Sequence, residues 1–544
     1  MTNLSIRFQI DTAKPGAPLG NKNSDINLFA ASNIDGSSRP SPLADVRNFT
    51  ETIQITQATG GNRQRDMFID PLNRTVLTDY NFSALIEACR AILSFGCKPY
   101  LKLGSVPLKF TEKADLGASF GVNCYPPDDY TAYYRYIRDI TAALAEEFGR
   151  DEIRSWRYSV MTEYENDGWF HTQDKDPENS MRAYFQLYDT TVAALQEILG
   201  EDVCVGAHAM GDIGNPYQLW DPLLLLEHCA VGKNYHTGKT GARLRFLTIS
   251  SYEWPMCHGN VRDIQKQFAP FKEKAAELGL QLFYGIDESR IGIGLSTGTL
   301  PGDLAGQPAN HITGHTYQAA YDAQLIKQMV DSDICYCSSW GYTSAHGVSC
   351  KGKAPDCYPT VSFHVANEYY GMCHASRLPV RAIWINGSAP ENKPCQIKAD
   401  ALASIDDENI YVMAYNFGNS VEYDTALDLS VEISLPGLHG QQTEVTTRVI
   451  GDNANFFPEW LRDRAKYGIG DNCFLRSPDS AALDSHNVLA DGWARELYYR
   501  ELRPKYVELS KLYPVITVEE IENGKLILEL ALSANNVAFF TVRR

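Results

Sequence analysis

The 544-residue sequence has no hydrophobic run approaching the length of a membrane span, and its start lacks the basic-then-apolar pattern of a secretion signal. It also has no run of lysine and arginine, and 49 basic against 67 acidic residues give a formal net charge of −18. Because such a surface repels phosphate backbones and anionic lipids, we expect no nucleic-acid partner and no membrane partner.

Cysteine is present but lacks the arrangement of a disulfide framework. The 13 cysteines are odd in number, and several lie in apolar strand-like runs, where a thiol behaves as a small hydrophobe. This pattern predicts a reducing, cytoplasmic location. The group Cys335, Cys337, Cys350 and Cys357 lacks the paired spacing of a zinc site, so packing or a local crosslink is favoured over metal. We expect no metal and no other cofactor.

Strand-like and helix-like segments alternate between about residue 25 and residue 375. The eight predicted strands are 26–30, 65–69, 99–103, 154–161, 203–207, 246–251, 282–286 and 334–338. Predicted helices between and after them are 82–95, 129–148, 180–199, 261–278, 316–330 and 361–372. Eight strands alternating with helices, without a glycine-rich phosphate loop, predict an α/β fold, a (β/α)8 TIM barrel, and argue against an open nucleotide-binding sheet.

After about residue 376 the apolar residues recur with a period of two, which indicates an antiparallel β-sandwich. Residues 4–10 alternate in the same way and are predicted to add a strand to it. The expected domains are an N-terminal strand in 1–20, a catalytic barrel in 21–375, and a sandwich in 376–544 with a helical, aromatic-rich insertion near 455–512.

Two glutamates directly follow predicted barrel strands, where the active sites of such barrels form. Glu163 follows the fourth strand and Glu288 follows the seventh. A carboxylate at the end of a buried strand incurs a desolvation cost, and each alone is more often structural than catalytic. Two carboxyl groups facing one sugar are what glycosidic cleavage requires, and a retaining pair is expected to lie about 5 Å apart.

Short motifs around these glutamates resemble glycoside hydrolase family 39 of clan A, which includes β-xylosidases and α-L-iduronidases. Trp156, Val160 and Glu163 match the family pattern W-x-F-E-V-W-N-E-P. The run KPYLKLGSVP at 98–107 is similar to K-P-x-x-E-L-x-F-M-P, and the Asp287-Glu288 pair resembles the nucleophile strand of the iduronidase branch. The resemblance implies a retaining glycoside hydrolase with Glu163 as acid/base and Glu288 as nucleophile. Family members are often multimeric, so the resemblance leaves a homo-oligomer open, and the sequence does not give the oligomeric state.

The sequence departs from the family at three of these positions. Thr162 replaces the asparagine before the acid/base, Tyr164 replaces the proline after it, and Lys102 replaces a glutamate. We expect removal of terminal sugars of the xyloside or arabinoside type. The alternatives are an α-L-arabinofuranosidase-like enzyme or a transglycosylase of the same clan, or a carbohydrate-binding protein whose site is catalytically dead.

Other polar and aromatic residues near the strand ends are predicted to bind the sugar. The predicted substrate-binding residues are Asn33, Lys102, Thr162, Tyr164, His208, Tyr252, Trp254 and Trp340. Of these, Tyr252 is expected to hydrogen-bond the nucleophile, and Trp340 to offer a platform for the sugar face. His208 is expected either at a sugar hydroxyl or tied to a backbone carbonyl.

Two further carboxylates compete for the catalytic roles. Glu165 takes the acid role if the fourth strand ends later than predicted. Asp287 is expected to point away from the cavity, because neighbouring strand residues alternate, and to form a salt bridge with Arg290. The Gly- and Thr-rich loop 293–314 is either a lid over the site or a plain surface loop.

Overall fold

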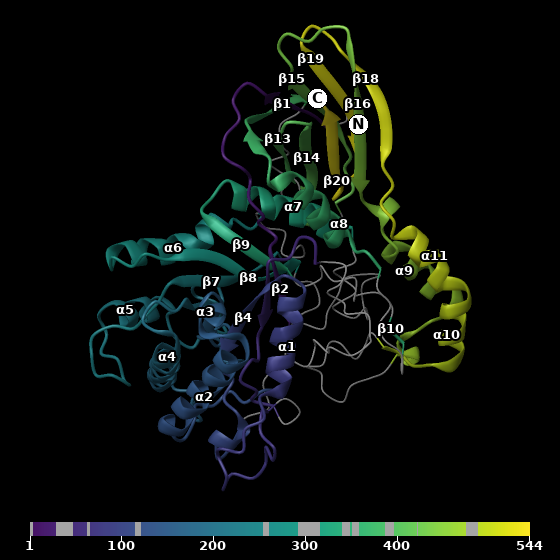
Figure 1. Ribbon diagram of the computed structural model, residues 1–544. Helices are drawn as coiled ribbons and strands as arrows, with labels where there is room; N and C mark the ends of the chain where they lie inside the picture. Colours follow the sequence, from purple (N-terminus) through teal and green to yellow (C-terminus); the bar gives the residue numbers. More distant parts are fainter. Residues whose placement is uncertain are drawn as a thin grey trace.

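The computed structural model describes residues 4–28, 47–62, 66–114, 121–253, 261–291, 316–339, 349–350, 358–386, 397–420, 423–474 and 488–544. Eight parallel strands close into a barrel, with each strand paired to the next and the first to the last through Asp25 and Ser338 (Figure 1). The strands are β2 (Asp25–Leu28), β3 (Thr52–Ile55), β4 (Lys98–Leu103), β5 (Arg157–Val160), β6 (Val205–Ala209), β7 (Phe246–Glu253), β8 (Phe283–Ile291) and β9 (Ile334–Ser339). This confirms the predicted TIM barrel.

Helices surround the barrel in the chain order expected of strand–helix units. They are α1 (Ser83–Ser94), α2 (Tyr130–Phe148), α3 (Arg150–Arg154), α4 (Pro177–Leu199), α5 (Leu223–Val231), α6 (Ile264–Glu277), α7 (Tyr317–Val330) and α8 (Val361–Cys373), with a 3-10 turn at Leu108–Phe110. The Asp129 carboxylate caps α2 by accepting from the backbone N–H groups of Thr131 and Ala132. No helix in the described ranges is both long and apolar enough to cross a membrane.

The second predicted strand, 65–69, was wrong. The second barrel strand is β3, and Phe68 forms only an isolated bridge with Tyr80. The Phe68 ring stacks on Tyr136 of α2, with 5.3 Å between centroids, so this apolar residue packs against the helical layer. The fourth strand was also predicted too long, because residues 150–154 form α3.

Two sheets form the second large unit. The six-stranded sheet has the order β11 (Ser376–Leu378), β13 (Ile397–Ile405), β14 (Asn409–Gly418), β20 (Val537–Arg543), β16 (Gln441–Ile450) and β18 (Val515–Ile521). The four-stranded sheet has the order β12 (Val380–Asn386), β1 (Leu4–Asp11), β15 (Leu427–Ser434) and β19 (Lys525–Leu532). The N-terminal strand β1 lies between β12 and β15, and it runs parallel to β15 although the other described pairings are antiparallel. Apolar side chains from both sheets share one core.

A helical segment separates β16 from β18 and lies below the sandwich, at the right of the view, in Figure 1. It contains α9 (Phe457–Tyr467), α10 (Gly492–Leu497) and α11 (Arg503–Leu509), a π-helical turn at Tyr498–Leu502, and 3-10 turns at Asp452–Ala454 and Asp471–Cys473. Trp460, Tyr498 and Tyr506 form a core of its own together with Tyr358, which follows the barrel's last strand. The parallel pairing of β10 (Ser349–Cys350) with β17 (Val488–Leu489) adds a second link to the barrel.

Candidate active site

Glu163 lies in a tight turn at the carboxyl end of β5. Met161 has φ 63° and Glu163 has φ 43°, which is the left-handed region that non-glycine residues rarely adopt. Two backbone hydrogen bonds hold this turn to the neighbouring strands: Met161 N to Leu103 O at 3.1 Å, and Tyr164 N to His208 O at 3.1 Å. Because strained conformations persist only where the surroundings enforce them, the turn indicates a functional position.

The Glu163 carboxyl group is buried and receives two hydrogen bonds. The Ser250 hydroxyl donates to Oε1 at 2.6 Å, and the Asn166 side-chain amide donates to Oε2 at 2.7 Å. Both contacts were absent from the sequence prediction. Ser250 lies two residues before Tyr252 on the same strand, so strict alternation along β7 would have placed it on the same face.

Glu288 lies in β8 next to a bulge. The pairing of β7 with β8 shifts between Ile249, which faces Ile286, and Ser250, which faces Glu288, so that Asp287 is an extra residue. A bulge breaks the alternation of side chains, and here it brings both Asp287 and Glu288 into the barrel interior. The expectation that Asp287 points away from the cavity was therefore wrong.

Glu288 has the environment of a carboxyl group poised near neutrality. Burial raises its pKa to about 7, and the charge of Glu163 adds to this effect, while Lys102 and the hydrogen bond from Tyr252 oppose it. The Tyr252 hydroxyl donates to Oε2 at 2.6 Å, which is the contact expected of this residue. The Thr162 hydroxyl lies 3.4 Å from Oε1.

The pKa of Asp287 is lowered, in contrast to that of Glu288. Burial favours its neutral form, but the charge and hydrogen bond of Lys102, and then the charge of Arg157, outweigh this and bring its pKa down to about 2. Its Oδ2 lies 3.0 Å from Lys102 Nζ and accepts from the Tyr100 hydroxyl at 2.9 Å. Asp287 thus forms a salt bridge with Lys102. The expected partner, Arg290, has its side chain outside the described part, so that prediction stays untested.

Lys102 and His208 lie beneath the carboxyl pair and have no solvent exposure. Lys102 Nζ is 2.9 Å from His208 Nδ1 and 3.4 Å from Thr162 Oγ1. The His208 ring bonds to side chains on both nitrogens, so neither of the two expected contacts, a sugar hydroxyl or a backbone carbonyl, is the one observed. Burial and the Lys102 charge lower the His208 pKa well below its usual value, which keeps the ring neutral.

Tyr164 and Glu165 turn into the barrel wall. Tyr164 stacks on Tyr184, and its hydroxyl donates to Pro222 O at 3.1 Å, so the structure does not bring it to the carboxyl pair. Glu165 Oε1 accepts from the backbone N–H of Met210 at 2.8 Å. Burial raises the Glu165 pKa to about 8. The left-handed turn thus separates two glutamates that alternation would place on one side.

Several predicted residues lie outside the described residues. They are Asn33, Trp254, Trp340, the loop 293–314 and Cys357. Within the described ranges, no group of three or more histidine, cysteine, aspartate or glutamate residues is arranged to hold a metal ion.

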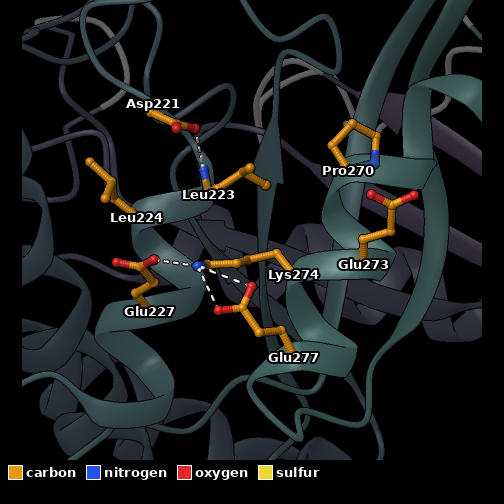
Figure 2. A pocket seen from close by; sticks show the side chains of 8 residues that line it. All are labelled: Asp221, Leu223, Leu224, Glu227, Pro270, Glu273, Lys274 and Glu277. Carbon is orange, nitrogen blue, oxygen red and sulfur yellow. Dashed lines mark hydrogen bonds and ion pairs between the residues drawn. The ribbon is translucent and has the colours of Figure 1, made fainter.

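A cavity of about 350 Å³ lies between α5 and α6 on the outer helical layer (Figure 2). Within its lining, Lys274 is paired with both Glu227 and Glu277. None of its lining residues belongs to the cluster around Glu163 and Glu288. We therefore place the candidate site at the strand ends and not in this cavity.

Comparison with known sequences shows what the chain is similar to. The model of glycosyl hydrolases family 39 matches residues 66–422. A β-xylosidase of Caldicellulosiruptor saccharolyticus is 22% identical over 279 residues, which cover 51% of this chain and 52% of that protein. A β-xylosidase of Geobacillus stearothermophilus is 23% identical over 119 residues, 22% of each chain. The match thus spans about half the length of the first relative and less of the second.

Solved structures share the whole architecture. A family 39 enzyme from Xanthomonas axonopodis pv. citri has a TM-score of 0.68 at 14% identity, covering 99% of this chain and 97% of its own. A monomeric β-xylosidase from Caulobacter crescentus CB15 has a TM-score of 0.66 at 14% identity, covering 99% of each chain. At such identities the likeness establishes the fold, a barrel followed by a sandwich.

Proposed function

Because the chain belongs to glycosyl hydrolase family 39, we propose that it is a glycosidase that cleaves O-glycosyl bonds with retention of configuration. The observation that carries this proposal is the pair of buried carboxyl groups at two barrel strand ends. They are electrostatically coupled, since the charge of Glu163 raises the pKa of Glu288. No cofactor is needed for this chemistry.

Glu288 is proposed as the nucleophile. Burial and a charge on Glu163 raise the Glu288 pKa to about 7, so the carboxylate that must attack is favoured when Glu163 holds the proton and carries no charge. The hydrogen bond from Tyr252 to Oε2 and the nearby ammonium of Lys102 also favour the Glu288 carboxylate. Attack on the anomeric carbon forms a glycosyl ester, and the leaving oxygen takes its proton from Glu163. Water then gives a proton to Glu163 and attacks the same carbon, which releases the sugar and restores the Glu288 carboxylate.

The substrate class follows from the relatives and is part of the proposal. Two curated relatives are named β-xylosidases, so we propose terminal xylosides or arabinosides as substrates. Thr162 stands where the family has asparagine, and its hydroxyl lies 2.6 Å from His208 Nδ1. An altered contact to the sugar is expected there. A cytoplasmic location also stays a prediction, and a homo-oligomer stays open.

The test uses a panel of nitrophenyl xylosides and arabinosides with the wild-type protein, Glu288→Gln and Glu163→Gln. We expect Glu288→Gln to lower kcat by about 10³- to 10⁵-fold, because loss of a nucleophile removes a step that binding alone cannot replace. Glu163→Gln is expected to impair substrates with poor leaving groups most strongly. Thermal unfolding of each variant checks that the fold is kept.

Glu165→Gln is the matched control, since it removes a second buried carboxyl group from the same turn. It is expected to keep near-normal activity at neutral pH. Near-normal activity of Glu288→Gln would overturn the assignment. A 2-fluoro xyloside that labels Glu288 supports an enzyme, whereas sugar binding without labelling or turnover supports a dead site. Product analysis with added acceptor sugars distinguishes hydrolysis from transfer.

A further inference from the structure

The His208 ring, at the end of β6, joins side chains from three other barrel segments. Its Nδ1 is 2.9 Å from Lys102 Nζ on β4 and 2.6 Å from the Thr162 hydroxyl after β5. Its Nε2 is 3.0 Å from Ser250 Oγ on β7. Ser250 in turn contacts Glu163 at 2.6 Å, so an unbroken line of buried groups leads from Lys102 to the proposed acid/base.

The chemistry of lysine determines which atom donates in each hydrogen bond from Lys102 to Glu163. An ammonium group can only donate, so His208 Nδ1 must accept, and in the neutral ring the hydrogen then lies on Nε2. Nε2–H donates to Ser250 Oγ. The hydroxyl has one hydrogen, and it donates that hydrogen to Glu163 Oε1. Each bond along the line therefore has one direction, and the Thr162 hydroxyl, 2.6 Å from the same accepting Nδ1, must also donate to it.

We propose that Lys102, His208 and Ser250 are positioning residues that hold the Glu163 carboxyl group for proton transfer to the leaving oxygen. This inference rests on the proposed function. Ser250 Oγ accepts a hydrogen bond from His208 Nε2–H and donates its own hydrogen to Glu163 Oε1. Ser250 therefore orients Glu163 without competing for the proton that Glu163 transfers. The ion pair of Lys102 with Asp287, at 3.0 Å, anchors the far end of the line beside the proposed nucleophile.

The test compares Ser250→Ala with Ser251→Ala on two substrates. Xylobiose has a poor leaving group that needs a proton, whereas 2,4-dinitrophenyl β-xyloside departs without one. We expect Ser250→Ala to lower kcat/KM on xylobiose by about ten- to a hundredfold, but on the dinitrophenyl substrate by less than about threefold. Ser250→Thr, which keeps the hydroxyl, is expected to restore most of the lost activity.

Ser251→Ala removes a buried hydroxyl from the neighbouring position of β7. That hydroxyl donates to Gln267 Oε1 of α6 at 2.7 Å, so both activities are expected to stay unchanged. An equal loss on both substrates in Ser250→Ala, or no rescue by Ser250→Thr, would overturn the positioning role. A wild-type protein inactive on both substrates counts instead against the proposed function on which the inference rests.

The tautomer of the His208 ring, which these hydrogen bonds determine, can be observed by NMR. In histidine-selective ¹⁵N NMR, with the signal assigned by its loss in His208→Gln, His208 is expected as the neutral Nε2–H tautomer. Its shifts should stay constant between about pH 5 and 8, where an ordinary histidine titrates. A protonated ring, or the Nδ1–H tautomer, would contradict the assigned direction.

Discussion

The interior of the barrel and the interior of the sandwich are built differently. The sandwich core consists of apolar side chains such as Ile6, Phe8, Val431 and Phe540. The barrel interior instead holds charged groups, with Asp25 paired to Arg157 and Lys102 paired to Asp287. The sandwich therefore shows how this chain gains stability by ordinary burial of apolar surface, while the barrel interior requires another explanation.

We infer that the charged groups of the barrel interior support the carboxyl pair, Glu163 and Glu288. Buried ion pairs contribute little net stability, because desolvation offsets much of their attraction. The two anions and the two cations of these pairs balance in charge. Gln54 links the two carboxylates by donating to Asp287 Oδ1 at 3.4 Å and to Asp25 Oδ2 at 3.3 Å. Of these charges, Lys102 reaches nearest to the site, because it contacts His208 and Thr162.

The largest expected effect comes from removing Lys102. Lys102→Met leaves Asp287 charged and unpaired in the interior, which is expected to lower the free energy of unfolding by about 3–5 kcal/mol. Phe8→Ala in the sandwich is expected to cost about the same through an unfilled cavity. Denaturant unfolding measures the loss of stability in both variants. Values of kcat/KM, measured well below the unfolding temperature, distinguish the two variants, since we expect only Lys102→Met to lose activity.

The double variant Lys102→Met, Asp287→Leu sharpens this comparison. It removes both charges, so we expect it to recover much of the stability but not the activity. Normal activity in Lys102→Met at a temperature where it is folded would show that the barrel charges are dispensable for function.

Glu165 gives the next effect, one that depends on pH. Its pKa of about 8 in the folded protein lies above the ordinary value of 4.5 because it is buried. Folding therefore favours the protonated form, and this contribution is lost as pH rises from about 4.5 through 8. Relative to Glu165→Gln, the wild-type protein should lose about 3–4 kcal/mol of unfolding free energy between about pH 5 and 8. Denaturant titrations at several pH values measure the difference, and parallel curves would contradict it.

The sequence singled out Glu163 and Glu288 because a polar residue near the end of an apolar strand is a local signal. The seventh strand was predicted too short, since β8 continues past Glu288 to Ile291. The sequence also predicted the Tyr252 contact with Glu288. It did not predict the bulge that turns Asp287 inward, since a bulge arises from the register between two distant strands. The contact of Lys102 with Asp287 joins strands far apart in the chain, so alternation within one strand gave no indication of it.

The smallest predicted effect tests the turn that carries Glu163. Gly104 follows β4, and a Cβ atom there would lie 2.7 Å from Met161 N and 2.8 Å from Met161 Sδ. Gly104→Ala must therefore push Met161, whose left-handed backbone precedes the acid/base. We expect it to lower the free energy of unfolding by about 1–3 kcal/mol and to reduce kcat more than it raises KM.

Gly371 in α8 provides the matched control, because an added Cβ there meets no atom within 4 Å. Gly371→Ala should be neutral or stabilise the helix by up to about 1 kcal/mol, with unchanged activity. Denaturant unfolding and steady-state kinetics compare the stability and activity of the two variants. If Gly104→Ala behaved like Gly371→Ala, the turn would tolerate displacement, and the barrel mouth would be less tightly constrained than the network beneath it.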